Sequence, residues 1–153
     1  VKNKAHWRQS PGPGYSASIL DKLNIETVVA PRVALADYLD PKRLLWAFFA
    51  DSFFFPFDNS AIRSSNPDQA VYIPLQEKLL RREMVDVGLG ALPESFDGYL
   101  KFVSSVVEKD RRLGAVAMKF EAAYFRSLYF ADPPLAQAAA VYAKYHSGGV
   151  PSP

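Results

Sequence analysis

The sequence contains no cysteine. This absence excludes disulfide bonds, thiol catalysis and zinc sites built on cysteine ligands. It also fits a reducing compartment, because disulfides are rare in the cytosol. No basic segment followed by an apolar one opens the sequence, so a signal peptide is not expected. We therefore predict a cytoplasmic protein.

Histidine is almost as scarce, and only His6 and His146 occur in the 153 residues. Two isolated histidines give no His-x-His metal pair and make a Ser-His-Asp triad improbable. His6 falls in an irregular lead-in, and His146 falls at a helix end, where a cationic ring would favour the helix dipole. We therefore expect no metal ligand from either residue. Glycine-rich phosphate-binding motifs and a Gly-x-Ser-x-Gly elbow are also missing.

The sequence also lacks a strong net charge and long apolar runs. The formal net charge of +2 gives no electrostatic reason to expect a nucleic-acid partner. The longest apolar runs, at 44–50 and 53–57, are too short to span a bilayer, so no membrane association is expected. What remains is a globular composition with 49% hydrophobic residues, which is enough to build a core. A small-molecule substrate is the predicted ligand.

Apolar periodicity predicts the order helix, strand, strand, helix, helix, strand, helix. The helices are predicted at 15–23, 75–87, 94–113 and 135–146, and the first two strands at 25–30 and 43–50. Pro31 ends the first strand, residues 59–67 form an exposed excursion, and Asp132 is the N-cap of the last helix.

The third strand lies within residues 113–124 and carries the most informative pattern. Alternation along a strand puts Lys119 and Glu121 on one face, while Val116, Met118 and Phe120 fall on the other. A strand with an apolar face and a second face that becomes charged at its carboxyl end is typical of α/β barrels. The pattern fits either the mouth of an active site or a structural Lys–Glu ion pair.

Connections between the strands are long enough for helical crossovers, which favours parallel pairing. Three strands cannot close a barrel, and open apolar strand edges promote aggregation. We therefore predict an α/β fold over residues 1–153: a single partial domain forming an incomplete (β/α) section like that of a TIM barrel. The remainder of the barrel or a second copy of the chain would then complete the sheet.

Several stretches resemble amidohydrolase-family proteins of bacteria. The most telling is AVAMKFEAAYFRSL, and the resemblance extends over nearly the whole chain. The supporting stretches are residues 25–28, 53–58, 75–82, 115–128, 132–134, 141–145 and 148–151.

The resemblance implies a metal-dependent hydrolase on a (β/α)₈ barrel, in which a metal-activated water attacks a carbonyl-type carbon. Members of this family bind one or two divalent metals, zinc or similar, through a His-x-His pair, two further histidines and an aspartate. This chain lacks that histidine set. The resemblance therefore implies that the chain is an internal section of the barrel, that the metal ligands lie outside it, and that it is inactive alone. The alternative is a non-catalytic α/β fragment or interaction module that self-associates through its open sheet edges.

Lys119 and Glu121 are the candidate catalytic residues. In some family members a carboxylated lysine on a strand bridges two metals, and Lys119 has the corresponding position. A contact with a substrate anion and a structural ion pair are the alternatives. Glu121 is a candidate general base or supporting residue, and pairing with Lys119 or Arg126 is its structural alternative.

Arg32, Asp51 and Arg126 are the candidate substrate-binding residues. Asp51 and Ser52 follow the second strand, at the active-site end of a barrel, although a turn cap is an equally ordinary role. Arg32 follows the first strand and could hold a carboxylate or phosphate, or lie on the surface. The phenylalanine cluster at 53–57 is expected to line a pocket or to pack in the core.

Overall fold

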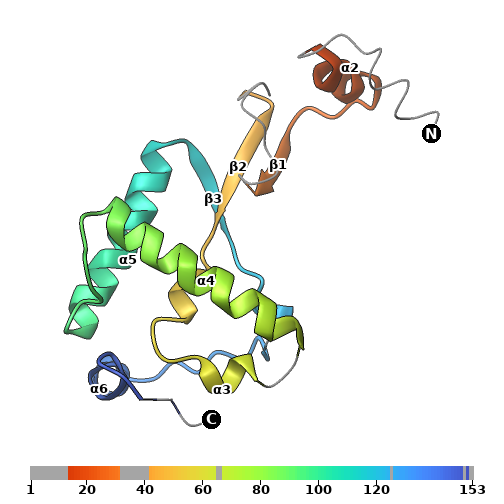
Figure 1. Ribbon diagram of the computed structural model, residues 1–153. Coiled ribbons are helices and arrows are strands. Elements are labelled where there is room, and N and C mark those ends of the chain that lie inside the picture. Colours follow the sequence, from red (N-terminus) through yellow and green to blue (C-terminus); the bar gives the residue numbers. More distant parts are fainter. Residues whose placement is uncertain (1–13, 32–41, 65–66, 125, 150, 152–153) are drawn as a thin grey trace. The chain divides into compact units, whose positions relative to one another are not determined.

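The computed structural model describes residues 14–31, 42–64, 67–124, 126–149 and 151. It has an α/β fold with a three-stranded parallel sheet and flanking helices. The chain divides into two compact units, residues 1–48 with 114–117, and residues 49–113 with 118–153. The described elements, labelled as in Figure 1, are α2 (Gly14–Lys22), β1 (Val28–Pro31), β2 (Leu44–Phe49), the 3₁₀ turn η2 (Asp51–Phe54), α3 (Ser60–Arg63), α4 (Pro67–Asp86), α5 (Phe96–Arg112), β3 (Ala115–Lys119), η3 (Ala122–Tyr124) and α6 (Leu135–Tyr145).

The sheet has the order β1-β2-β3, so β2 is its central strand. Val28 of β1 lies opposite Leu44 of β2, and Pro31 lies opposite Ala47. All three predicted strands are present, but β1 begins at Val28 instead of residue 25. Pro31 is the last residue of β1, a position that an edge strand tolerates because proline cannot donate a ladder hydrogen bond.

In the first unit, Arg43 joins the end of α2 to the start of β2. Its guanidinium forms an ion pair with Asp21 and donates hydrogen bonds to the carbonyls of Ile25 and Glu26. Asn24 adopts a left-handed conformation with φ 51°, which asparagine tolerates better than most residues and which ends the helix as predicted.

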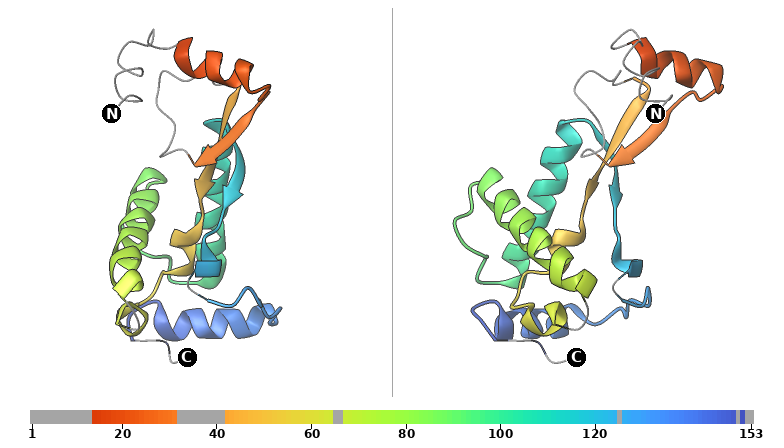
Figure 2. Two further views of the ribbon diagram at one scale, coloured as in Figure 1. Left: turned by 90° about the vertical axis from the view of Figure 1, so that its right-hand side faces the viewer. Right: turned by 45° about the vertical axis from the view of Figure 1, so that its right-hand side comes forward.

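The second unit has a core of side chains from α4, α5 and α6, comprising Leu80, Met84, Tyr99, Phe102, Val106 and Tyr142. Helix α6 packs across the N-terminal end of α5, as Figure 2 shows. Predicted helices 94–113 and 135–146 are therefore confirmed as α5 and α6. The cap of α6 was predicted wrongly, because the N-cap residue is Pro134 rather than Asp132.

Helix α4 begins at Pro67, well before the predicted start at residue 75. Pro67 suits the first helical position, and Pro74 is accommodated inside the helix. The buried face of α4 contains three polar residues, Gln69, Gln76 and Glu83, which disguise its periodicity in the sequence. Leu75 belongs to the opposite, exposed face.

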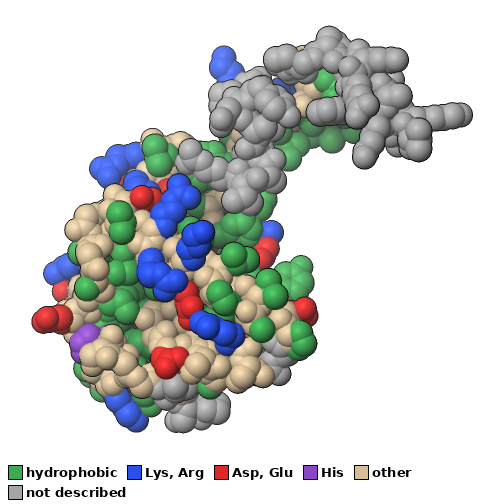
Figure 3. All heavy atoms as spheres, viewed as in Figure 1, with side chains coloured by type: hydrophobic (Ala, Val, Ile, Leu, Met, Phe, Trp, Pro, Cys, Tyr) green, Lys and Arg blue, Asp and Glu red, His purple; other side chains and the backbone are tan. Residues whose placement is uncertain are grey.

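The exposed face of α4 is both basic and apolar. Lys78, Arg81 and Arg82 are exposed along it, and Figure 3 shows lysine and arginine side chains gathered over this helix. Val71 and Val85 are also exposed.

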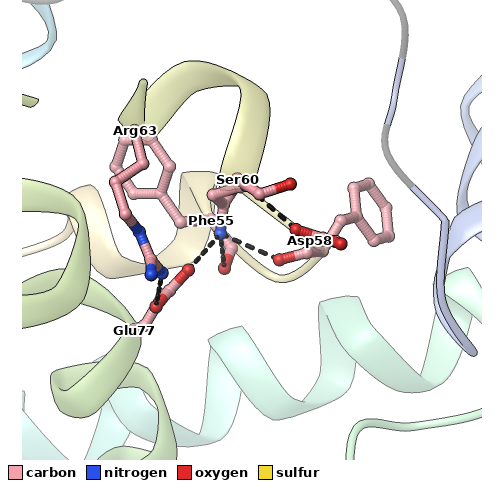
Figure 4. Close-up of polar contacts among 7 residues, drawn as sticks. Phe55, Asp58, Ser60, Arg63 and Glu77 are labelled. Atoms are coloured by element: carbon pink, nitrogen blue, oxygen red, sulfur yellow. Dashed lines mark hydrogen bonds and ion pairs between the residues drawn. The ribbon is translucent and has the colours of Figure 1, made fainter. Parts of the chain in front are cut away.

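Residues 59–67 were predicted as an exposed excursion, and most of the described residues in this segment are exposed. The helix α3 at residues 60–63, which packs on α4, was not predicted. The buried side chain of Asn59, directly before α3, stabilises this short helix. Its amide donates to the carbonyls of Phe55 and Phe57 and to Glu77 on α4. Arg63 pairs with the other carboxylate oxygen of Glu77 at 2.7 Å, so one α4 carboxylate anchors both ends of the turn (Figure 4).

Candidate functional site

The candidate site lies where β2 and β3 end, at the carboxyl edge of the sheet. The backbone N–H of Ala50 donates to the carbonyl of Lys119 at 3.0 Å, so the two strand ends remain paired. Directly beyond this bond, both carboxylate oxygens of Asp51 accept a hydrogen bond from the backbone N–H of Glu121, at 2.8 and 3.0 Å. The aspartate after β2 therefore fixes the backbone that follows β3.

Lys119 and Glu121 form the ion pair that their strand spacing allows. The Lys119 ammonium lies 3.2 Å from Glu121 Oε1, and 5.3 Å from the centroid of the Phe49 ring. The two side chains are 43% and 26% exposed, so solvent and small molecules can reach them. At this exposure the ion pair contributes at most about 1 kcal/mol to folding.

Asp51 has a positioning role in this structure. Its side chain is completely buried and accepts a hydrogen bond from the Glu121 backbone N–H. Burial raises the pKa of Asp51, the Glu121 N–H partly opposes that change, and the Glu121 carboxylate adds to it. The local cap role considered for Asp51 is not what the structure shows, because η2 has no side-chain cap and the Asp51 carboxylate instead accepts from the backbone N–H of Glu121, 70 residues away in the sequence.

A second buried acid, which was not predicted from the sequence, is hydrogen-bonded to the residue after Asp51. Glu83 of α4 is 6% exposed, and Oε2 of its carboxyl accepts a hydrogen bond from Ser52 Oγ at 2.9 Å. Burial raises the pKa of Glu83 to about 7; the Ser52 bond acts against this change, and the charge of Asp110 acts with it. Glu83 lies on the same helical face as Ile73, Gln76 and Leu80. Its burial could have been predicted only if this face had first been identified as the buried one.

Tyr72 of α4 belongs to the same environment. Burial raises the pKa of its hydroxyl, and the negative charges of Asp51 and Glu121 raise it further. Asp51, Ser52 and Glu83, which are buried, and Tyr72, which is half-buried, thus form a buried polar layer next to the partly exposed Lys119–Glu121 pair, and ionisation is disfavoured for its acidic members.

The remaining predicted residues lie elsewhere. The Arg126 guanidinium donates to the carbonyls of Ser127 and Tyr129 and stacks 4.4 Å from the ring centroid of Phe130, so its own loop holds it. The partner of Glu121 is Lys119, one of the two partners considered. Arg32 lies outside the described residues.

Metal binding does not fit the described part of the chain. Among these residues no group of three histidine, cysteine, aspartate or glutamate side chains could hold an ion. His146 stacks on Tyr142 at 5.6 Å between ring centroids, and His6 lies outside the described residues. Of the helices in residues 14–31, 42–64, 67–124 and 126–149, none has the length and hydrophobicity of a membrane span.

A comparison of the chain with protein-family models, with curated proteins and with solved structures found no match.

Proposed function

We propose that this chain is a section of an amidohydrolase-like, metal-dependent hydrolase with a (β/α)₈ barrel, and that the carboxyl edge of its sheet is one wall of the active site. The observation that carries the proposal is the accessible Lys119–Glu121 pair at the paired ends of two parallel strands. Active sites of parallel α/β barrels lie at this edge, where loops from several strands converge.

In the proposed site, Lys119 supplies a cation for an anionic or polarised oxygen of the substrate. Glu121 supplies a carboxylate that can accept a proton, since it is partly exposed. Asp51 is a positioning residue, because both of its carboxylate oxygens accept from the backbone N–H of Glu121, at 2.8 and 3.0 Å.

The described residues do not build a metal site by themselves, and the whole sequence has only two histidines, too few for the family's ligand set. The proposal therefore assigns the divalent-metal ligands to sequence outside these 153 residues or to another chain. In this arrangement the chain contributes substrate contacts and proton handling.

The test is hydrolysis of a panel of amides, esters and lactones by the complete gene product. Lys119→Met and Glu121→Gln should each lower kcat/KM at least about 100-fold, the usual scale for a group that acts on the reacting atoms. Lys101→Met is the matched control, because Lys101 also pairs with a carboxylate, at 2.7 Å, but on an exposed face of α5. Unchanged kcat/KM in both site variants would refute the assigned roles.

A second candidate is a non-catalytic module that self-associates through its sheet edges. The exposed apolar side chains of β3, Val116 at 54% and Met118 at 51%, support it, because a second copy of the chain could cover them; the rest of a barrel would do the same, so oligomeric state decides between the two candidates. Sedimentation velocity of the 153-residue chain tests this candidate. A concentration-dependent dimer supports self-association, and a monodisperse monomer refutes it.

A further inference from the structure

The second unit contains an aromatic pocket that the proposed hydrolase function does not use. It has a volume of about 390 Å³ and lies between η2, the start of α5 and α6. Its walls include Phe53, Phe54, Phe57, Phe96, Ala138 and Tyr142. Their separation in the sequence shows that the pocket exists only when the unit is folded.

Two tyrosine hydroxyls hold the walls in place. Tyr99 donates to the carbonyl of Phe53 at 2.7 Å, and Tyr142 donates to the carbonyl of Pro93 at 2.7 Å. The Tyr142 ring also packs against Phe57 and Phe96, at 5.6 and 5.8 Å between centroids. The pocket is thus largely formed before any ligand arrives, as small-molecule sites usually are.

The chemistry of the walls restricts the ligand. None of the described residues that line the pocket is charged, and the hydroxyls of Tyr99 and Tyr142 are committed to backbone carbonyls. A charged group placed against these apolar walls would lose part of its hydration without a compensating partner. Gln137, exposed on the pocket wall, carries an amide that can accept or donate a hydrogen bond.

The volume of the pocket and the orientation of the rings in its walls restrict the possible ligands further. A dry apolar cavity of about 150 Å³ already holds benzene, so a pocket of about 390 Å³ accommodates two fused rings. Tilted aromatic walls offer both ring faces and ring edges, which suit an aromatic guest.

We propose that this pocket binds a small, uncharged, planar aromatic compound of one or two rings, with one polar group directed at Gln137. The proposal does not depend on hydrolase activity.

Indole is the probe, and ligand-observed NMR titration of the 153-residue chain is the measurement. Indole should bind saturably, and indole-3-acetate should bind at least about tenfold more weakly because its carboxylate is charged. Ala138→Trp, which fills the pocket, should weaken indole binding at least about tenfold, while Ala136→Trp on the exposed side of α6 should leave it unchanged.

A milder variant covers the case in which Ala138→Trp does not fold. Gln137→Leu should remove the preference for indole over N-methylindole, which lacks the N–H donor, and leave the affinity for N-methylindole within about twofold. Absence of indole binding, equal loss in Ala136→Trp, or binding of indole-3-acetate as tight as that of indole would overturn the proposal. A dimer that only Ala138→Trp dissociates would also overturn it, because the pocket would then be an interface between copies.

Discussion

Replacing Glu83 by glutamine should stabilise the protein at alkaline pH and leave it nearly unchanged near pH 5. Glu83 is buried on α4, and burial raises the pKa of its carboxyl from 4.5 to about 7. Glutamine has nearly the same shape and retains an oxygen that can accept the Ser52 hydrogen bond. The substitution therefore removes the charge and preserves the packing.

The sign of the effect follows from the protons bound in each state. Below pH 4.5 the carboxyl is protonated in both the folded and the unfolded chain, so it contributes no pH dependence. Between pH 4.5 and about 7 the unfolded chain loses the proton first, so the free energy of unfolding falls as pH rises. Each unit of pKa difference between the folded and the unfolded chain corresponds to about 1.4 kcal/mol. Ionisation of Glu83 therefore lowers the free energy of unfolding by about 3 kcal/mol above pH 7.

Urea unfolding near pH 5 and near pH 8.5 measures this difference. The stability of Glu83→Gln relative to wild type should increase by about 2–3 kcal/mol between these conditions. Glu94→Gln is the control, because Glu94 is exposed and its replacement should have no pH-dependent effect. If both variants follow the wild-type pH dependence, Glu83 ionises normally in the folded protein and the buried polar layer is described wrongly.

Three further predictions concern hydrogen bonds of the second unit. Asn59→Ala should lower the free energy of unfolding by about 2 kcal/mol in urea melts, because it removes the hydrogen bonds of a buried amide to the Phe55 and Phe57 carbonyls and to Glu77. A change below about 0.5 kcal/mol would show that α3 is held by other contacts. Ser95→Ala should cost about 1 kcal/mol by removing the N-cap that accepts from Gly98 N–H, whereas Ser104→Ala, in the exposed middle of α5, should cost nothing. Tyr142→Phe should lower the free energy of unfolding by about 1 kcal/mol in thermal melts, because it removes the hydrogen bond to the Pro93 carbonyl. An unchanged melting temperature would contradict the role of this hydroxyl in holding the wall of the aromatic pocket.

The sequence predicted the strands and the long helices because their signals are local. β-branched residues located β1 and a continuous apolar run located β2. Glycines in left-handed conformations, Gly88 with φ 82° and Gly114 with φ 97°, marked the helix ends. The start of α4 was missed because Pro74 suggests a helix boundary and because the buried face carries glutamines and a glutamate. Helix α3 was missed because the tertiary contacts of Asn59 stabilise it, and four residues have no helical periodicity.

The candidate site was likewise predicted only where the signal is local in the sequence. Spacing placed Lys119 and Glu121 on one strand face; in the structure β3 ends at Lys119, and Glu121, two residues beyond the strand, forms the ion pair with it. The bond between Asp51 and the Glu121 backbone depends on how two strands meet, which no local pattern encodes. The burial of Glu83 and Tyr72 likewise depends on the packing of α4, and their raised pKa values follow from that packing.

Divalent-metal dependence of hydrolysis by the complete gene product tests the central claim most directly. The account predicts that chelation reduces the rate to background, that zinc or a similar ion restores it, and that Lys119→Met stays impaired after the ion is returned. Hydrolysis that resists chelation, or no hydrolysis of any carbonyl substrate with metal present, would contradict the account.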